Sequence, residues 1–366
     1  MIERNNIAES LDVMRFPLML GVILIHSEGL FPENHYLVNY SCSMCWLFTF
    51  IKSYLLPIFV PSFFFISGFL FFLHVPSYSI GCYKKKMIRR YHSLFVPYIL
   101  WTVIDFLYLA VKGFVSQGAT LQDTTFLTQM LTLNIFWDYT PQGLPLHQPL
   151  WYVRNLLVVA FCSPIIYQFL KRFYAALLVL VALGIIYVSK PFMPIYNSIA
   201  LSFFYFSLGA FFVLHHDRLK AHLNAINVVM ILIAILVCYL CHVGKLSISC
   251  FTIPAVACAI LSFVHIQECL RVRLHPIIIR ASFFTYCLHT FIIVGLVEMG
   301  FRYIIPDNAA SIFVLFRYLL APVMVYFICC LIYAMMQKII PSALDILTGG
   351  RTISRVEQRN NKNTEV

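Results

Sequence analysis

The sequence predicts an all-α membrane protein, a polytopic helix bundle with about ten transmembrane helices and both termini in the cytoplasm. The first observation is composition: 61% of the 366 residues are hydrophobic and 11% are charged, whereas soluble domains contain about 45–50% apolar and about 25% charged residues. The second is that the apolar residues gather in stretches close to the roughly 20 residues that a helix needs to cross a bilayer. The third is the content of 34 Phe and 21 Tyr, which excludes a disordered chain.

Each of ten hydrophobic segments is expected to form one membrane span. They lie near residues 12–30, 48–73, 94–112, 149–170, 174–189, 195–214, 225–243, 247–267, 283–300 and 310–337. Together they predict one membrane domain over residues 1–340, followed by a polar, disordered cytoplasmic tail over residues 341–366. No small-residue cleavage site follows the first segment, so we expect a retained helix and not a signal peptide.

The distribution of positive charge predicts the orientation of the chain in the membrane. With a cytoplasmic N-terminus, 18 of the 26 Lys and Arg fall in inside segments and only four fall in outside loops. Cytoplasmic loops carry the excess of Lys and Arg, so both termini are expected inside, in a multi-pass protein of the cell (inner) membrane. The net charge of +11 is therefore an orientation signal, and no nucleic-acid partner is expected.

Cysteine and histidine spacing does not predict a metal site. The 12 Cys lie mostly within the spans, where Cys behaves as a small apolar residue. Cys42 and Cys45 form a CxxC in the loop after the first span, which leaves a disulfide or redox role open. No Cys and His group has the spacing of a zinc site.

The first span carries the polar residues of greatest interest, because charge at membrane depth is costly and is usually kept for function. Arg15 and His26 are 11 residues apart, which places them about 20° apart around a helix and about 16 Å apart along its axis. Either Arg15 reaches the interface and His26 makes a structural hydrogen bond, or the pair serves chemistry. A histidine can act as a general base, and an arginine can bind a phosphate group. A ligand with a phosphate at one end and a reactive group at the other could bridge the two residues, and acyl-coenzyme A has this form.

Further residues each have a structural and a functional interpretation. Ser67 and Gly68 favour close helix packing, with a direct part in catalysis as the alternative. The basic run over residues 84–90 either anchors the chain at anionic lipid or contacts coenzyme A phosphates. Asp105 and Glu298 lie in or near spans, where either carboxylate could orient a histidine.

The middle and late spans add candidates for the acceptor side. Trp151 occupies a position typical of an aromatic belt, with stacking on a sugar as the alternative. Arg154 either binds an anion or makes structural pairs. His289 falls three residues after Tyr286 on the same helix face, and it either lines the site or packs in the bundle.

Five motifs, in order along the chain, resemble the acyltransferase-3 family of integral membrane acyltransferases that modify extracytoplasmic sugars and glycans. They are SLDVMRFPLMLGVILIH (10–26), PSFFFISGFLFF (61–72), YKKKMIRRYHSLFVPYILW (83–101), PLWYVRNLLV (149–158) and SFFTYCLHTFII (282–293).

The resemblance implies a membrane O-acyltransferase that moves an acyl group, by default acetyl, from cytoplasmic acyl-CoA (acetyl-CoA) to a hydroxyl of an extracytoplasmic or lipid-linked saccharide. It implies His26 as the catalytic base and Arg15, Arg89 and Arg90 as donor-binding residues. Trp151, Arg154, Tyr286 and His289 are candidates for the acceptor site or its supporting residues.

The expected partners are acyl-CoA, a saccharide or glycolipid acceptor and the bilayer, with a homo-oligomer left open and no tightly bound cofactor. The alternative function is transport or export of a small anion or of an acyl or sugar compound, since a many-helix protein with buried Arg and His could carry one. The absence of an internal repeat in the sequence argues against it. A membrane scaffold or sensor without chemistry is the third class.

Overall fold

The computed structural model describes residues 4–30, 41–75, 78–117 and 133–351. Within these ranges every regular element is a helix, which confirms the all-α prediction. The main helices are α1 (Arg4–His26), α3 (Cys42–Phe50), α4 (Leu56–Phe72), α5 (Ile80–Arg90), α6 (Val96–Gln117), α8 (Trp151–Phe161), α9 (Ser163–Leu170), α10 (Phe173–Ser189), α11 (Pro194–Leu214), α13 (Leu223–His242), α14 (Ile248–Leu270), α15 (Pro276–Leu288), α16 (Ile293–Ile304), α17 (Ser311–Ile339) and α18 (Pro341–Thr348).

Every expected hydrophobic segment falls on one of these helices or on a bent pair of them. Six helical stretches in the described part of the chain are long and apolar enough to cross a membrane. Two further pairs are sharply bent, α8 with α9 by 62° and α15 with α16 by 90°, which gives up to eight spans. The remaining two expected segments are α10, which is only 17 residues long, and α1, which carries charged residues.

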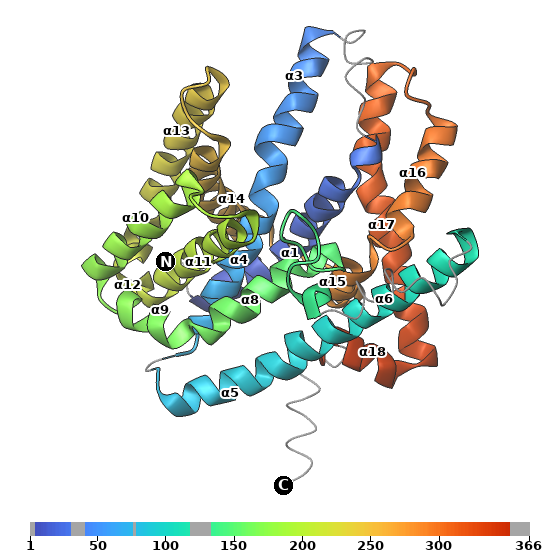
Figure 1. Cartoon of the computed structure of the whole chain (residues 1–366). Coiled ribbons are helices and arrows are strands. Elements are labelled where there is room, and N and C mark those ends of the chain that lie inside the picture. The colour runs from blue at the N-terminus through green and yellow to red at the C-terminus, as the bar shows by residue number, and fades with distance from the viewer. Residues whose placement is uncertain (1–3, 31–40, 76–77, 118–132, 352–366) are drawn as a thin grey trace.

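The centre of the bundle is formed by α1, α4 and α11, with the α13–α14 hairpin on one side and α16 and α17 on the other (Figure 1). Glycines let α4 and α11 approach closely. A Cβ atom on Gly68 would lie 2.0 Å from the Phe206 carbonyl oxygen, and one on Gly209 would lie 2.0 Å from the Phe65 carbonyl oxygen. Small residues commonly allow such backbone contact between membrane helices, as the sequence predicted for Gly68.

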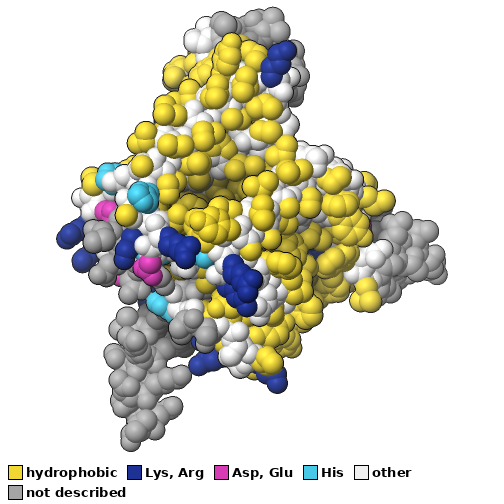
Figure 2. Space-filling model, turned by 90° about the vertical axis from the view of Figure 1, so that its left-hand side faces the viewer, with side chains coloured by type: hydrophobic (Ala, Val, Ile, Leu, Met, Phe, Trp, Pro, Cys, Tyr) yellow, Lys and Arg dark blue, Asp and Glu magenta, His cyan; other side chains and the backbone are white. Residues whose placement is uncertain are grey.

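The outer surface of the bundle is largely apolar, as a lipid-facing surface must be. On the face shown in Figure 2, hydrophobic side chains cover most of the surface, and most Lys and Arg lie in its lower half. Helix α13 illustrates this surface, because Leu232, Ile235 and Tyr239 are all more than half exposed.

Residues 341–348, which were expected to begin a disordered tail, instead form α18, which packs beneath α6, α15 and α17. The reason is an apolar face that a polar tail would lack. Leu344 is fully buried, and the Trp101 indole donates a hydrogen bond to the Leu347 carbonyl oxygen at 3.1 Å. Residues 352–366 of the expected tail lie outside the described residues.

Candidate active site

A cavity of about 410 Å³ lies between α1, α4, α8 and α15. Helix α5 and the chain after α18 also contribute to its wall. Its polar or aromatic lining side chains include Arg15, His26, Ser67, Arg90, Trp151, Tyr152, Ser282, Tyr286 and Arg351. Five residues that the sequence predicted for the site, Arg15, His26, Arg90, Trp151 and Tyr286, therefore share one cavity although they come from four segments of the chain.

Helix α1 places a cation and a histidine at two separate points of this cavity. Arg15 and His26 both line it, and their spacing of 11 residues in one helix corresponds to about 16 Å along the axis. Arg15 also pairs with Asp12 across one helical turn, with Nη1 and Oδ1 3.0 Å apart, and both side chains remain more than a third exposed. The predicted same-face arrangement of Arg15 and His26 therefore holds.

Three guanidinium groups line the cavity, from Arg15, Arg90 and Arg351. Arg90 lies over the ring of Phe71, at 5.5 Å from the ring centroid, and Arg351 lies over Phe283 at 3.9 Å. Within the described part of the chain, neither Arg90 nor Arg351 has a carboxylate within ion-pair distance. Three cations with a single carboxylate partner, Asp12, make this region of the cavity attractive to an anion.

The charge of Arg351 persists at neutral pH. Burial, followed by the nearby Arg15 and Arg90 guanidinium groups, lowers the pKa of Arg351 to about 10. A group with this pKa remains protonated at pH 7, so repulsion among the three cations is present whenever the cavity holds no anion.

A second histidine supports the ring of His26. The rings of His26 and His289 meet edge to face with their centroids 5.1 Å apart. Nδ1 of His289 lies 3.0 Å from the Thr285 carbonyl oxygen and 2.9 Å from that of Tyr286. Two carbonyl acceptors at Nδ1 require the proton there, whereas Nε2 is buried and has no hydrogen-bond partner among the residues that the structure describes. His289 does not line the cavity itself.

Hydroxyl groups also line the cavity. The Tyr152 hydroxyl and Ser67 Oγ are hydrogen-bonded at 2.8 Å, and the Tyr286 hydroxyl donates to the Pro149 carbonyl oxygen. Ser282 Oγ lies 2.9 Å from the Tyr326 hydroxyl. Ser67 therefore contributes a polar group to the cavity, in addition to the packing role of its neighbour Gly68.

Besides His289, two further predicted site residues do not line the cavity. Arg89 is exposed on α5 and is absent from the cavity wall, although the adjacent Arg90 is part of it. Arg154 is 2% exposed and donates to Asn155 Oδ1 at 3.0 Å and to the carbonyl oxygens of Gly143 and Trp137. These hydrogen bonds hold the segment before α8 in place, so the contacts of Arg154 are those of the structural interpretation.

Two carboxylates also have clear positions. Asp105 Oδ2 lies 3.1 Å from Nδ1 of His147, whose Nε2 lies 2.9 Å from the Cys287 carbonyl oxygen. Asp105 thus orients a histidine, but the histidine is His147 and not His26. Glu298 lies beside Gly29, since a Cβ atom there would be 2.5 Å from Glu298 Oε2.

Sequence reasoning did not select Ser282 or Arg351. Ser282 lies within the last of the five motifs and has no signal of its own, and Arg351 lies in the expected tail, where its charge indicates orientation. Only the packing of α18 brings Arg351 to the cavity, so no local sequence pattern could have identified it.

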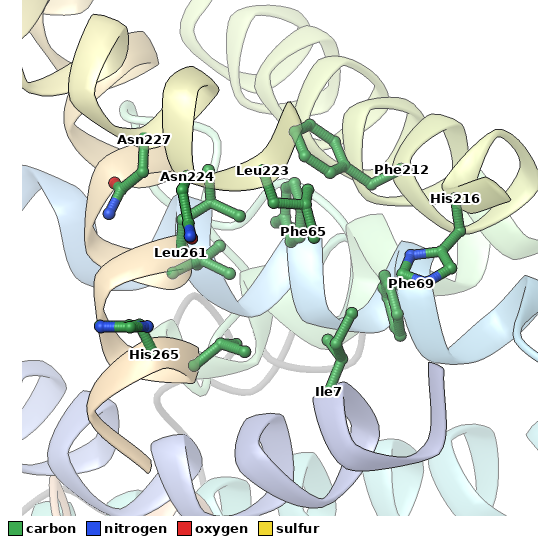
Figure 3. Close-up of a pocket in the computed structure, with 12 residues that line it drawn as sticks. Ile7, Phe65, Phe69, Phe212, His216, Leu223, Asn224, Asn227, Leu261 and His265 are labelled. Carbon is green, nitrogen blue, oxygen red and sulfur yellow. The ribbon is translucent and has the colours of Figure 1, made fainter. Parts of the chain in front are cut away.

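A smaller cavity between α4, α13 and α14 is unsuited to a substrate. It holds about 30 Å³ and is lined mostly by apolar side chains, with His216, Asn224, Asn227 and His265 at its edge (Figure 3). A space of this size admits about one or two water molecules. Among the described residues, no group of three or more His, Cys, Asp or Glu is arranged to hold a metal ion.

Comparison with known proteins gives one family and one characterised relative. Residues 8–342 match the family model described as an acyltransferase domain, Acyl_transf_3. The chain is also 26% identical over 222 residues to the succinoglycan biosynthesis protein ExoH of Rhizobium meliloti (strain 1021), a match that covers 59% of this chain and 56% of the relative. No solved structure matches the chain. Because the family model spans nearly the whole membrane domain, including every predicted site residue, the chain belongs to the acyltransferase-3 family.

Proposed function

We propose that this protein is a membrane O-acyltransferase that moves an acyl group, by default acetyl, from cytoplasmic acyl-CoA to a hydroxyl of an extracytoplasmic or lipid-linked saccharide. The observation that carries the proposal is one cavity that joins an arginine cluster to His26, about 16 Å further along α1. We assign the protein to the inner membrane, because the bias of Lys and Arg predicts cytoplasmic termini.

The arginine cluster fits the donor. Acyl-CoA carries its phosphates at one end and its thioester at the other, on a flexible arm. Arg15 and Arg90 are proposed to bind the phosphates through charge-assisted hydrogen bonds, for which the planar guanidinium is well suited. The thioester carbonyl would then lie further into the cavity, toward His26.

His26 is proposed as the general base of a direct transfer. It accepts the proton of the acceptor hydroxyl while the hydroxyl oxygen attacks the thioester carbonyl carbon. The tetrahedral intermediate then collapses, the carbon–sulfur bond breaks, and the coenzyme A thiolate leaves and takes up the proton. The products are an ester of the saccharide and free coenzyme A, so no oxidant, metal or resident cofactor enters the balance.

A saccharide acceptor is supported by the aromatic side chains of the cavity and by the relative. Trp151, Tyr152 and Tyr286 line the wall, and aromatic faces commonly pack against apolar ligand surfaces. The relative carries succinoglycan biosynthesis in its name, which favours a glycan over a small soluble alcohol.

The test is mass spectrometry of surface glycans from cells with the gene, without it, and with His26→Gln. We expect the added mass of an acyl group, by default acetyl, to be present only with the wild-type gene. Membranes should also transfer label from acetyl-CoA to the glycan. A glycan that is lost altogether without the gene, and not merely stripped of its acyl group, would indicate export and contradict the enzyme proposal.

A further inference from the structure

The chain after α18 approaches the cavity through two glycines. Gly349 and Gly350 have φ values of +66° and +77°, a conformation that glycine adopts without strain. The Gly350 N–H donates to the Asp345 carbonyl oxygen at 2.9 Å, which ends α18. The backbone at Gly349 also lies against Ser93, because a Cβ atom there would be 2.5 Å from the Ser93 carbonyl oxygen.

This turn is fixed from both sides. On one side, α18 is attached to α6 by the hydrogen bond from Trp101 to Leu347 and by the buried side chains of Leu344 and Thr348. On the other side, Ser93 lies three residues after Arg90. The contact between Gly349 and Ser93 therefore brings the next arginine, Arg351, to the same part of the cavity as Arg90.

Arg351 is held there by contacts that leave its charge uncompensated. Its guanidinium covers the ring of Phe283, a cavity residue, at 3.9 Å from the centroid, and Nη1 donates to the Thr348 carbonyl oxygen. Among the described residues no carboxylate lies within ion-pair distance of it. A cation placed beside two other cations is unfavourable unless an anion binds among them.

We propose that Arg351 is a third donor-binding residue, which completes with Arg15 and Arg90 a guanidinium clamp for the phosphate groups of the acyl donor. The inference rests on the proposed function and extends it to a part of the chain that the family match, which ends at residue 342, does not include. A polyanion with several phosphates is the ligand class that three convergent guanidinium groups fit best.

The experiment measures binding of coenzyme A itself to the purified full-length protein in detergent by isothermal titration calorimetry. Arg351→Ala and Arg351→Gln should weaken binding about tenfold or more, the loss expected for one charge-assisted hydrogen bond. Arg351→Lys should recover part of the affinity, because it restores the charge but not the planar fork. The matched control is Lys338→Ala, since Lys338 is an exposed cation at the end of α17, outside the cavity.

Two further measurements exclude a merely structural role. The melting temperature without ligand should be the same in wild type and Arg351→Gln, and only the stabilisation by coenzyme A should be smaller in the variant. The affinity of wild type should also fall more steeply with added salt than that of Arg351→Gln.

The outcomes separate this inference from the proposed function. Equal coenzyme A affinity in wild type and both uncharged variants would overturn the role of Arg351 and leave the donor proposal intact. Absence of coenzyme A binding in wild type would overturn the proposed donor, and the clamp with it. An equal loss of affinity in Lys338→Ala would also overturn the clamp, because the effect would then be one of general surface charge.

Discussion

Replacing His26 with glutamine removes a proton acceptor from the cavity while retaining a side chain that can form hydrogen bonds. His26 lines the cavity at the end of α1, and the ring of His289 packs against it at 5.1 Å. Glutamine can preserve much of this packing, so we expect normal insertion and normal protein levels. What it cannot do near neutral pH is take up the proton of an attacking hydroxyl.

The expected loss follows from that missing step. A general base contributes about 10²–10⁴-fold in rate, which corresponds to about 2.7–5.4 kcal/mol of transition-state stabilisation at 1.36 kcal/mol per tenfold. Arg15 lies about 16 Å away from His26 along the axis of α1, so donor binding should be unchanged. His26→Gln should therefore lower kcat by at least about a hundredfold and leave the KM for acyl-CoA close to that of wild type.

The assay is transfer of labelled acetyl from acetyl-CoA to glycan acceptor in membranes with matched protein levels. His289→Gln serves as the paired control, because His289 is buried behind His26 and its Nδ1 proton is already engaged by two carbonyl oxygens. It should lose less activity than His26→Gln. Near-normal turnover in His26→Gln would refute His26 as the base, and the reverse order of the two losses would assign that role to His289.

Three further predictions follow from the site and the fold. Arg90→Ala should raise the KM for acyl-CoA about tenfold or more, whereas Arg89→Ala should leave it unchanged, because only Arg90 of these two residues lines the cavity. Equal effects of the two substitutions would indicate that both arginines anchor the chain at the membrane. Gly209→Ala should lower the melting temperature in detergent and Gly295→Ala should not, since an added methyl meets the Phe65 backbone in the first case and nothing within 4 Å in the second; overpacking typically costs about 1–3 kcal/mol. A reporter fused after Lys362 should be active only in the cytoplasm and one placed near Gln142 only outside, and reversal of either would contradict the predicted orientation.

The helices, and the pairing of Arg15 with His26 on one face of α1, could be predicted from the sequence because each depends on a local pattern. Apolar stretches of about 20 residues predict spans, and helical geometry alone places Arg15 and His26 on one face. The bends were not predictable in this way. Within the expected span near 149–170, the helix breaks between Phe161 and Ser163 with a bend of 62°, and hydropathy carries no information on direction.

The remaining parts of the site depend on contacts between distant segments. Arg89 and Arg90 are indistinguishable by composition, and only the packing of α5 against the bundle places one in the cavity wall and the other in solvent. Arg154 resembles an anion-binding residue until the carbonyl oxygens of Gly143 and Trp137 are seen to accept its hydrogen bonds. The sequence after Pro341 is polar on average and therefore predicts a tail that includes Arg351, although the buried side chain of Leu344 and the hydrogen bond to the Leu347 carbonyl oxygen hold this segment on the bundle.

The arrangement of charge connects the orientation of the protein with the direction of the proposed reaction. Lys and Arg gather at the ends of spans that the positive-inside bias assigns to the cytoplasm. Arg90 and Arg351 of the cavity belong to those segments, and Arg15 lies within the first expected span, near its predicted cytoplasmic end. On the proposed orientation, the same charge would attract an anionic donor from the cytoplasmic side, where acyl-CoA is made. His26 lies further along α1, which on the proposed orientation is toward the outside, where a glycan hydroxyl would arrive. On this proposal the acyl group crosses the bilayer within the cavity, while the charged part of the donor remains at the cytoplasmic end, where binding it requires no charge to enter the apolar core.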